Sequence, residues 1–255
     1  MSRIEKAFSA RKALIPYLTL GYPGLNTALE VVPRLEEWGA DLVELGIPFS
    51  DPLADGATIQ EASFQALALG MTPALALEMA GRLRQKVALP LVFMSYYNPL
   101  YRFGLEGFCR ASAQAGVDGL IVPDLPPEEG EELEGACHKN GLALVYLLAP
   151  NSPPERIDMV LRHSRGFVYL VSLTGVTGPR EALPPEMEAF VGRVKEKSTL
   201  PLAVGFGIAN PEQARRAARV ADGVIVGSRL VQLLKGEPKQ IEAFVRGLRK
   251  ALDEP

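Results

Sequence analysis

The sequence has few cysteines, no long apolar run and no excess of charge of one sign, and each absence narrows the class of protein. No charge-poor apolar stretch reaches the roughly 18 residues that a membrane helix needs, so no membrane association is expected. The N-terminus mixes charged and apolar residues and has no small-residue cleavage site, which predicts a cytoplasmic protein without a secretory signal. The 27 basic and 30 acidic residues form no basic block, so we expect no nucleic-acid partner.

Side chains with distinctive chemistry are also scarce. Cys109 and Cys137 lie far apart in segments of helical pattern, so we expect buried free thiols and not a redox or metal pair. His138 and His163 also fall in helical segments, and no cluster has the spacing of metal ligands, so no metal site is predicted. None of the nine lysines lies in a predicted strand, which argues against a strand-borne Schiff base. Carboxylates and a tyrosine remain as candidates for acid and base catalysis.

Short β-branched runs alternate with longer amphipathic segments along the whole chain. Eight of these runs are predicted strands, starting near positions 14, 42, 91, 120, 144, 167, 201 and 223. Strict alternation of strand and helix implies parallel pairing. We therefore predict an α/β protein with one domain over residues 1–255, a (β/α)8 TIM barrel, ahead of an open doubly wound sheet.

The interval between the second and third predicted strands is the longest in the chain. It holds a loop with Asp51 and Asp55 and a helical stretch over 55–70, before the usual crossover segment at 72–87. This pattern predicts an extra helix after strand two. Loops after the carboxyl ends of barrel strands form the active face, so the enlarged loop indicates function, although a tolerated insertion is the alternative.

A carboxylate stands inside the second predicted strand, in "LVELGI" at 42–47. Burying an unpaired ionised group in a dry core is costly, so packing alone would favour an aliphatic residue at this position. Strand alternation puts Glu44 on the same face as Leu42 and Gly46. If this face lines the barrel interior, Glu44 borders a substrate pocket; the alternative is a structural Glu bonded to neighbouring strand groups.

Glycine-containing turns follow the last three predicted strands, at 175–178, 205–207 and 227–228. Glycines let backbone N–H groups approach an anion, and together these turns favour a phosphate site, although each alone is typical of an ordinary tight turn. If the reaction cleaves a carbon–carbon bond without a metal or an imine, the substrate must accept the electrons itself. An indole protonated at C3 can do so, with a carboxylate near the ring N–H.

Six motifs together identify a family. "ELGIPFSDPLADGATIQ", "MSYYNPLYRFG", "VPDLPPEE", "YLVSLTGVTG", "GFGI" and "GVIVGS" occur in the order typical of tryptophan synthase alpha chains, and the chain resembles that family over nearly its whole length. The resemblance implies a lyase of tryptophan biosynthesis that cleaves indole-3-glycerol phosphate into indole and glyceraldehyde 3-phosphate. It also implies three catalytic residues, namely Glu44 as general acid and base, Asp55 on the indole N–H, and Tyr169. The implied substrate contacts are Tyr17, Ile59, Met94, Ile121, Thr177, Gly178, Phe206, Gly207, Gly227 and Ser228.

The resemblance further implies an α2β2 complex with a beta chain that carries pyridoxal phosphate, and no cofactor in this chain. The aromatic connection "YYNPLYRFG" at 96–104 independently suggests a docking loop, although internal packing of its rings is the alternative. Asp124 matches a loop acid of the family and could equally be a turn or cap residue. Tyr22 and Leu173 stand where some relatives have an acidic and a basic residue. A stand-alone indole-releasing lyase, a sugar-phosphate isomerase and a non-catalytic sugar-phosphate sensor remain alternatives.

Overall fold

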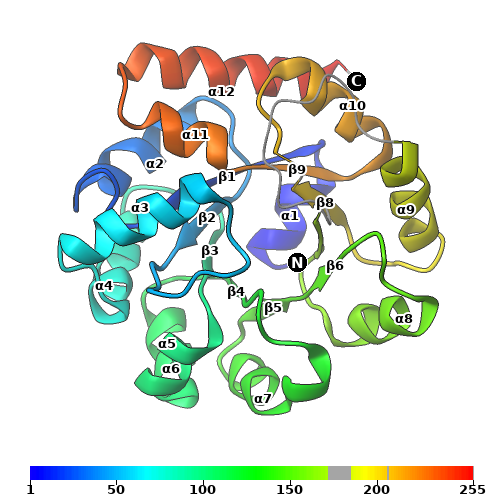
Figure 1. The fold of residues 1–255 in the computed structure, drawn as a ribbon, viewed down its shortest axis with the longest axis horizontal. Helices are drawn as coiled ribbons and strands as arrows, with labels where there is room; N and C mark the ends of the chain where they lie inside the picture. The colour runs from blue at the N-terminus through cyan, green and yellow to red at the C-terminus, as the bar shows by residue number, and fades with distance from the viewer. Residues whose placement is uncertain (172–184, 206, 255) are drawn as a thin grey trace.

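Parallel strands and helices alternate along the chain in the computed structural model, which describes residues 1–171, 185–205 and 207–254 (Figure 1). The strands are β1 (Ala13–Thr19), β2 (Val43–Gly46), β3 (Leu91–Met94), β4 (Gly119–Ile121), β5 (Ala143–Val145), β6 (Leu147–Leu148), β7 (Val168–Val171), β8 (Leu202–Gly205) and β9 (Gly223–Val226). They form one sheet in the order β5-β4-β3-β2-β1-β9-β8-β7-β6, with parallel pairing. The sheet curls into a nearly closed barrel, which confirms the predicted fold class.

The fifth predicted strand is interrupted at Tyr146, and for this reason the described residues form nine strands where eight were expected. β5 pairs with β4 and β6 pairs with β7, so the two ends of the sheet are the two halves of one predicted strand. The Tyr146 hydroxyl donates a 2.7 Å hydrogen bond to Glu134 Oε1, and Nδ1 of His163 lies 2.9 Å from the same oxygen. The buried ring at the interruption is therefore tied to the outer helices.

An outer ring of helices surrounds the barrel (Figure 1). Its members are α2 (Thr27–Glu37), α4 (Pro73–Arg84), α6 (Leu105–Gln114), α7 (Glu131–Lys139), α8 (Pro154–His163), α9 (Pro185–Lys195), α10 (Pro211–Val220) and α12 (Pro238–Asp253). Two of them begin with a capping residue followed by proline: Thr72 accepts the N–H of Leu75 before α4, and Asn210 accepts that of Gln213 before α10. In the described parts of the chain, no helix combines the length and apolar character needed to cross a membrane.

Further helices are added to this ring. They are α1 (Arg3–Ser9), α3 (Ala57–Ala68), α5 (Tyr97–Phe103), η1 (Pro127–Glu129) and α11 (Ser228–Leu233). α3 is the extra helix predicted after strand two. α5 corrects the expectation of a loop after strand three: Asp124 accepts the N–H of Tyr97 at 2.9 Å and satisfies the start of the helix, and Gly104, at φ +94°, ends it.

Alternate strand residues fill the barrel interior with apolar side chains. The buried interior cluster comprises Ile4, Ala13, Ile15, Leu42, Val92, Ile121, Val145, Phe167, Ala203 and Ile225. Helix α1 closes the end of the barrel at which the strands begin, because Ile4 belongs to this cluster and the Phe8 ring lies 5.4 Å from that of Phe167. The opposite end, where the strands finish, is the face on which barrel active sites form.

Three aspartates at the joints before strands form the same clamp at the closed end. Each donates its N–H to the carbonyl of the first or second residue of a neighbouring strand, and its carboxylate accepts the N–H of that same residue. The pairs are Asp41 with Leu14, Asp118 with Leu91 and Asp222 with Leu202, and all six distances are 2.8–3.0 Å. These three aspartates therefore fix the register of adjacent strands.

The two cysteines are buried free thiols, as predicted, but the expectation drawn from their spacing was incomplete. Cys109 on α6 and Cys137 on α7 lie with their sulfurs 3.8 Å apart. The two helices are neighbours in the outer ring, so residues 28 positions apart in the sequence meet in the core.

Candidate active site

Glu44 lies inside the barrel, as the second of the four residues of β2. Its neighbours in the parallel register are Tyr17 on β1 and Val92 on β3, and Leu42, two residues earlier, belongs to the interior cluster. The side chain is 0% exposed, and neither carboxylate oxygen has a hydrogen-bond partner among the described residues. Burial raises the pKa of Glu44 to about 8. At neutral pH the carboxyl group therefore holds its proton and can act as an acid.

Two interior tyrosines stand close to this carboxyl group. Glycines make room for both: a β-carbon on Gly46 would overlap the Tyr17 hydroxyl, and one on Gly205 would lie 2.6 Å from that of Tyr169. Burial, together with the negative charges of Glu44 and Asp55, raises the pKa of both tyrosines. Both hydroxyls therefore stay neutral and can donate or accept a hydrogen bond, as Tyr17 does with Thr19 at 3.2 Å.

Asp55 reaches the site from the loop between β2 and α3. Its Oδ2 accepts a 3.1 Å hydrogen bond from the Tyr96 hydroxyl, and its backbone carbonyl accepts one of 2.9 Å from Gln60. Burial raises the pKa of Asp55 to about 6, and the bond from Tyr96 acts in the opposite direction. Two carboxyl groups thus face the same region with different protonation states: near pH 7 Asp55 is ionised and Glu44 is neutral.

Tyr96 is a site residue that the sequence reasoning missed. The motif that contains it was read as an aromatic docking loop, which drew attention to the exposed rings further along. A signal was present, because Tyr96 follows the last residue of β3 by two positions and so lies at the open end of the barrel.

The residues expected to line the substrate pocket lie at the same end. Ile121 is fully buried in the interior cluster, and Met94 and Tyr169 pack against this cluster. A β-carbon on Gly227 would lie 3.5 Å from Tyr17 and 3.7 Å from Ile59, so α3, β1 and the turn before α11 meet here.

The glycine turns of the expected phosphate site are described only in part. Ser228 begins α11 directly after Gly227, and Gly207 takes the left-handed φ of +67°. The remaining predicted contacts, Thr177, Gly178 and Phe206, lie outside the described residues.

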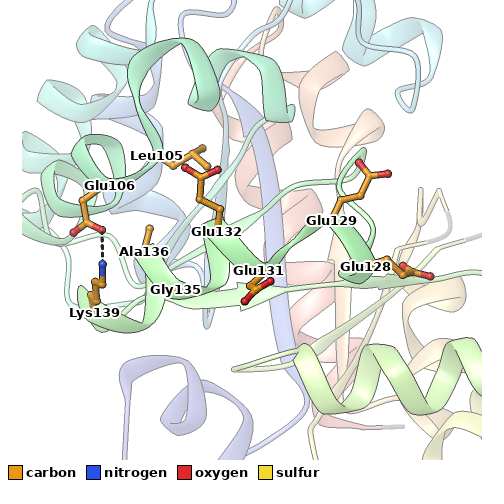
Figure 2. A pocket seen from close by; sticks show the side chains of 9 residues that line it. All are labelled: Leu105, Glu106, Glu128, Glu129, Glu131, Glu132, Gly135, Ala136 and Lys139. Atoms are coloured by element: carbon orange, nitrogen blue, oxygen red, sulfur yellow. Dashed lines mark hydrogen bonds and ion pairs between the residues drawn. The ribbon is translucent and has the colours of Figure 1, made fainter.

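A surface cleft of about 690 Å³ lies on the outside of the barrel, between α6, α7 and η1 (Figure 2). Five glutamates line it, and one of them, Glu106, is paired with Lys139 at 3.4 Å. None of its lining residues belongs to a strand or to the predicted site, so the cleft is separate from the carboxyl pair in the barrel.

Comparison with known proteins gives the family. The sequence model of the family described as "Tryptophan synthase alpha chain" matches residues 4–253. The chain belongs to the tryptophan synthase alpha chain family. An alpha chain from Dehalococcoides mccartyi is 53% identical over 255 residues, covering 99% of this chain and 100% of that protein. One from Roseiflexus sp. is 49% identical over 260 residues, covering 98% and 100%.

Solved structures agree with this alpha-chain assignment. A chain of tryptophan synthase from Mycobacterium tuberculosis superimposes with a TM-score of 0.93 at 38% identity, covering 98% of each chain. The alpha subunit from Legionella pneumophila gives a TM-score of 0.90 at 36% identity over the full length of both chains. The family resemblance and the barrel predicted from the sequence are therefore confirmed.

Proposed function

We propose that this chain is the lyase subunit of tryptophan synthase, which cleaves indole-3-glycerol phosphate into indole and glyceraldehyde 3-phosphate in tryptophan biosynthesis, with Glu44 as general acid and base. The observation that carries the proposal is the fully buried carboxyl group of Glu44 in the interior of an alpha-chain barrel, without a hydrogen-bond partner among the described residues and neutral at pH 7, with the ionised Asp55 facing the same region. A biosynthetic enzyme of this kind is expected in the cytoplasm, and that location stays a prediction.

The two carboxyl groups suit the two tasks of the reaction. Glu44 delivers its proton to C3 of the indole ring, and the ring becomes cationic. Asp55, ionised, accepts the indole N–H and stabilises that positive charge. The bond from C3 to the side chain then breaks, its electrons restore the aromatic ring, and the hydroxyl group on the departing carbon becomes the aldehyde. The Glu44 carboxylate takes up the hydroxyl proton, so the enzyme ends in its starting state.

Substrate binding is assigned to the residues around this pair. Tyr17, Ile59, Met94 and Ile121 supply the apolar contacts for the indole ring, and Tyr169 supplies a neutral hydroxyl near Glu44. The phosphate is assigned to the glycine turns. Of the expected contacts, Gly207, Gly227 and Ser228 are among the described residues, and Thr177, Gly178 and Phe206 are not. The short distance from Gly227 to Tyr17 and Ile59 supports this arrangement, because it places the phosphate turn next to the indole pocket.

The expected partner is a tryptophan synthase beta chain in an α2β2 complex, with pyridoxal phosphate in the beta chain. We assign docking to an aromatic face formed by Tyr97, Tyr101 and Phe103 on α5, together with Leu53 in the neighbouring loop. The rings of Tyr97 and Tyr101 stack 5.9 Å apart, and Tyr101 is 60% exposed. Phe103 packs its edge on Phe108 yet stays 41% exposed, and Leu53 is 90% exposed. Exposed apolar side chains that gather in this way are typical of an interface.

Indole release from indole-3-glycerol phosphate by the purified chain, with and without a tryptophan synthase beta chain, tests the function. We expect slow release that rises sharply when the partner is added. Fast release that the partner does not change would favour a stand-alone lyase. No release in either condition would favour a sugar-phosphate sensor and overturn the proposal.

The variant Glu44→Gln tests the mechanism, because the amide keeps the shape but cannot donate the acidic proton. We expect turnover to fall by about 10³-fold with substrate binding retained, as for loss of a general acid. The matched control is Glu242→Gln on α12, where the carboxylate is exposed and paired with Arg246. Turnover retained in Glu44→Gln would remove Glu44 from the reaction.

A further inference from the structure

Tyr96 connects two loops at the open end of the barrel through its hydroxyl group. It is the N-cap residue of α5 and follows β3 closely, whereas Ala54 and Asp55 lie in the loop after β2. The hydroxyl oxygen accepts the N–H of Ala54 at 2.9 Å, and the hydroxyl proton is donated to Oδ2 of Asp55 at 3.1 Å. One group therefore holds both the backbone and the carboxylate of the loop, from 41 positions further along the chain.

The ring that carries this hydroxyl is itself fixed. Tyr96 is buried, and its ring lies 5.3 Å from the ring of Phe49 at the start of the same loop. The hydroxyl of Ser95 donates to the carbonyl of Tyr96 at 3.1 Å, and Asp124 fixes the next residue by accepting the N–H of Tyr97. Asp55 is therefore held by a donor whose position is set before any ligand binds.

The other groups around Asp55 do not supply this hydrogen bond. Glu44 on β2, Tyr17 on β1 and Tyr169 on β7 face the same region, and Asp124 acts on Tyr96 from the loop after β4. Among the described residues no lysine or arginine pairs with Asp55, and Tyr96 is the one side chain that donates a hydrogen bond to its carboxylate. Burial and the charge of Asp55 raise the pKa of Tyr96, so the donor keeps its proton throughout the working range.

We propose that Tyr96 is a positioning residue for the lyase reaction, whose hydroxyl orients the Asp55 carboxylate toward the indole N–H and keeps it ionised. This role of Tyr96 rests on the proposed function, because it assumes that Asp55 contacts the substrate. Without the hydroxyl, the buried carboxylate loses its donor, the N–H of Ala54 loses its acceptor, and the loop loses both of its bonds to the Tyr96 side chain. The same loss makes protonation of Asp55 easier, because a hydrogen bond to a carboxylate favours the charged form.

The variant Tyr96→Phe in the full chain tests this role with two readouts. Carbon NMR of the aspartate carboxyl groups, with the Asp55 signal assigned from Asp55→Asn, gives the titration of Asp55 without any need for turnover. We expect its midpoint to rise by about one pH unit, as for loss of one hydrogen bond to a charged group. The acid limb of the kcat/KM profile should shift to higher pH by the same amount. Relative to the native chain, kcat/KM of the variant should then be about tenfold lower below pH 6 and much less reduced at pH 8.

The matched control is Tyr146→Phe, which removes another buried hydroxyl that donates to a carboxylate, that of Glu134, outside the site. This control should leave both the Asp55 midpoint and the acid limb unchanged. If Tyr96→Phe does not fold, 3-fluorotyrosine placed at position 96 keeps the ring and makes the donor more acidic, and the Asp55 midpoint should then fall.

The outcomes separate this proposal from the function on which it rests. An Asp55 midpoint that is unchanged in folded Tyr96→Phe, or unchanged with the fluorinated ring, overturns the positioning role whatever the activity. Full turnover in Asp55→Asn overturns the assigned role of Asp55, while the NMR midpoints still report whether Tyr96 controls its ionisation.

Discussion

Glu44 and Tyr17 lie at matched positions on the adjacent parallel strands β2 and β1, and both side chains point into the barrel. Glu44 has no hydrogen-bond partner in the described residues, whereas the Tyr17 hydroxyl bonds with Thr19. The tyrosine therefore places a polar side chain close to the carboxyl group of Glu44 without forming a hydrogen bond to it. Stability alone would not favour this arrangement, and it leaves Glu44 free to exchange a proton with a substrate.

The pH dependence of the isolated chain should be bell-shaped. Asp55 must be ionised to accept the indole N–H, so kcat/KM should rise as the pH passes about 6. Glu44 must be protonated to act as an acid, so kcat/KM should fall as the pH passes about 8. Initial rates of indole release between pH 5 and 9 check both limbs. A profile that keeps rising above pH 8 would contradict the assigned state of Glu44.

Removing the buried carboxyl group should stabilise the fold, and more so at high pH. In the unfolded chain Glu44 ionises near its ordinary pKa, but in the folded chain burial raises that pKa to about 8. Between these values the folded state holds the extra proton, so the contribution of Glu44 to stability falls by up to about 1.4 kcal/mol for each pH unit. The variant Glu44→Gln has no ionisable group at this position and does not lose stability with pH in this way. Urea unfolding at pH 5.5 and 8 should show the stability difference, variant minus native, growing with pH, and a constant difference would count against the shifted pKa.

The aspartate clamp at the closed end should matter more than an exposed ion pair. Asp118 accepts the N–H of Leu91 at 3.0 Å and lies 3.0 Å from Arg3 and 3.6 Å from the half-buried Arg84. Asp118→Ala leaves these groups without their acceptor, and we expect a loss of about 3 kcal/mol in the free energy of unfolding.

The control for this clamp is Asp158→Ala. Its carboxylate forms an exposed 2.7 Å pair with Lys197, so the loss should stay below about 1 kcal/mol. Urea denaturation of both variants gives the comparison, and equal losses would show that the clamp adds nothing beyond a surface pair.

Docking of the beta chain should depend on the exposed rings of α5. Tyr101→Ser removes the most exposed ring of the aromatic face, and we expect the affinity for a beta chain to fall about tenfold, as when an aromatic anchor is truncated. Leu69→Ser, at the C-cap of α3, removes an exposed apolar side chain outside that face and should leave the affinity unchanged. A binding titration with both variants decides the assignment, and unchanged affinity in Tyr101→Ser would place the interface elsewhere.

The sequence by itself determined the alternation of strands and helices, the extra helix α3 and the strand that carries Glu44. These features follow from local periodicity, because a period of two residues sets the faces of a strand and a period near 3.6 sets the stripe of a helix. The six motifs also determined the family, since they extend over nearly the whole chain in a fixed order.

Only the tertiary structure decided which distant side chains meet. The interruption of the fifth strand at Tyr146, the contact between Cys109 and Cys137, and the bond from Tyr96 to Asp55 each join residues that local pattern treats separately. The same holds for the pKa of Glu44, because desolvation depends on how completely the closed barrel surrounds the carboxyl group. Curling of the sheet into the barrel brings these residues together, and the position of a residue along the chain carries no direct record of that geometry.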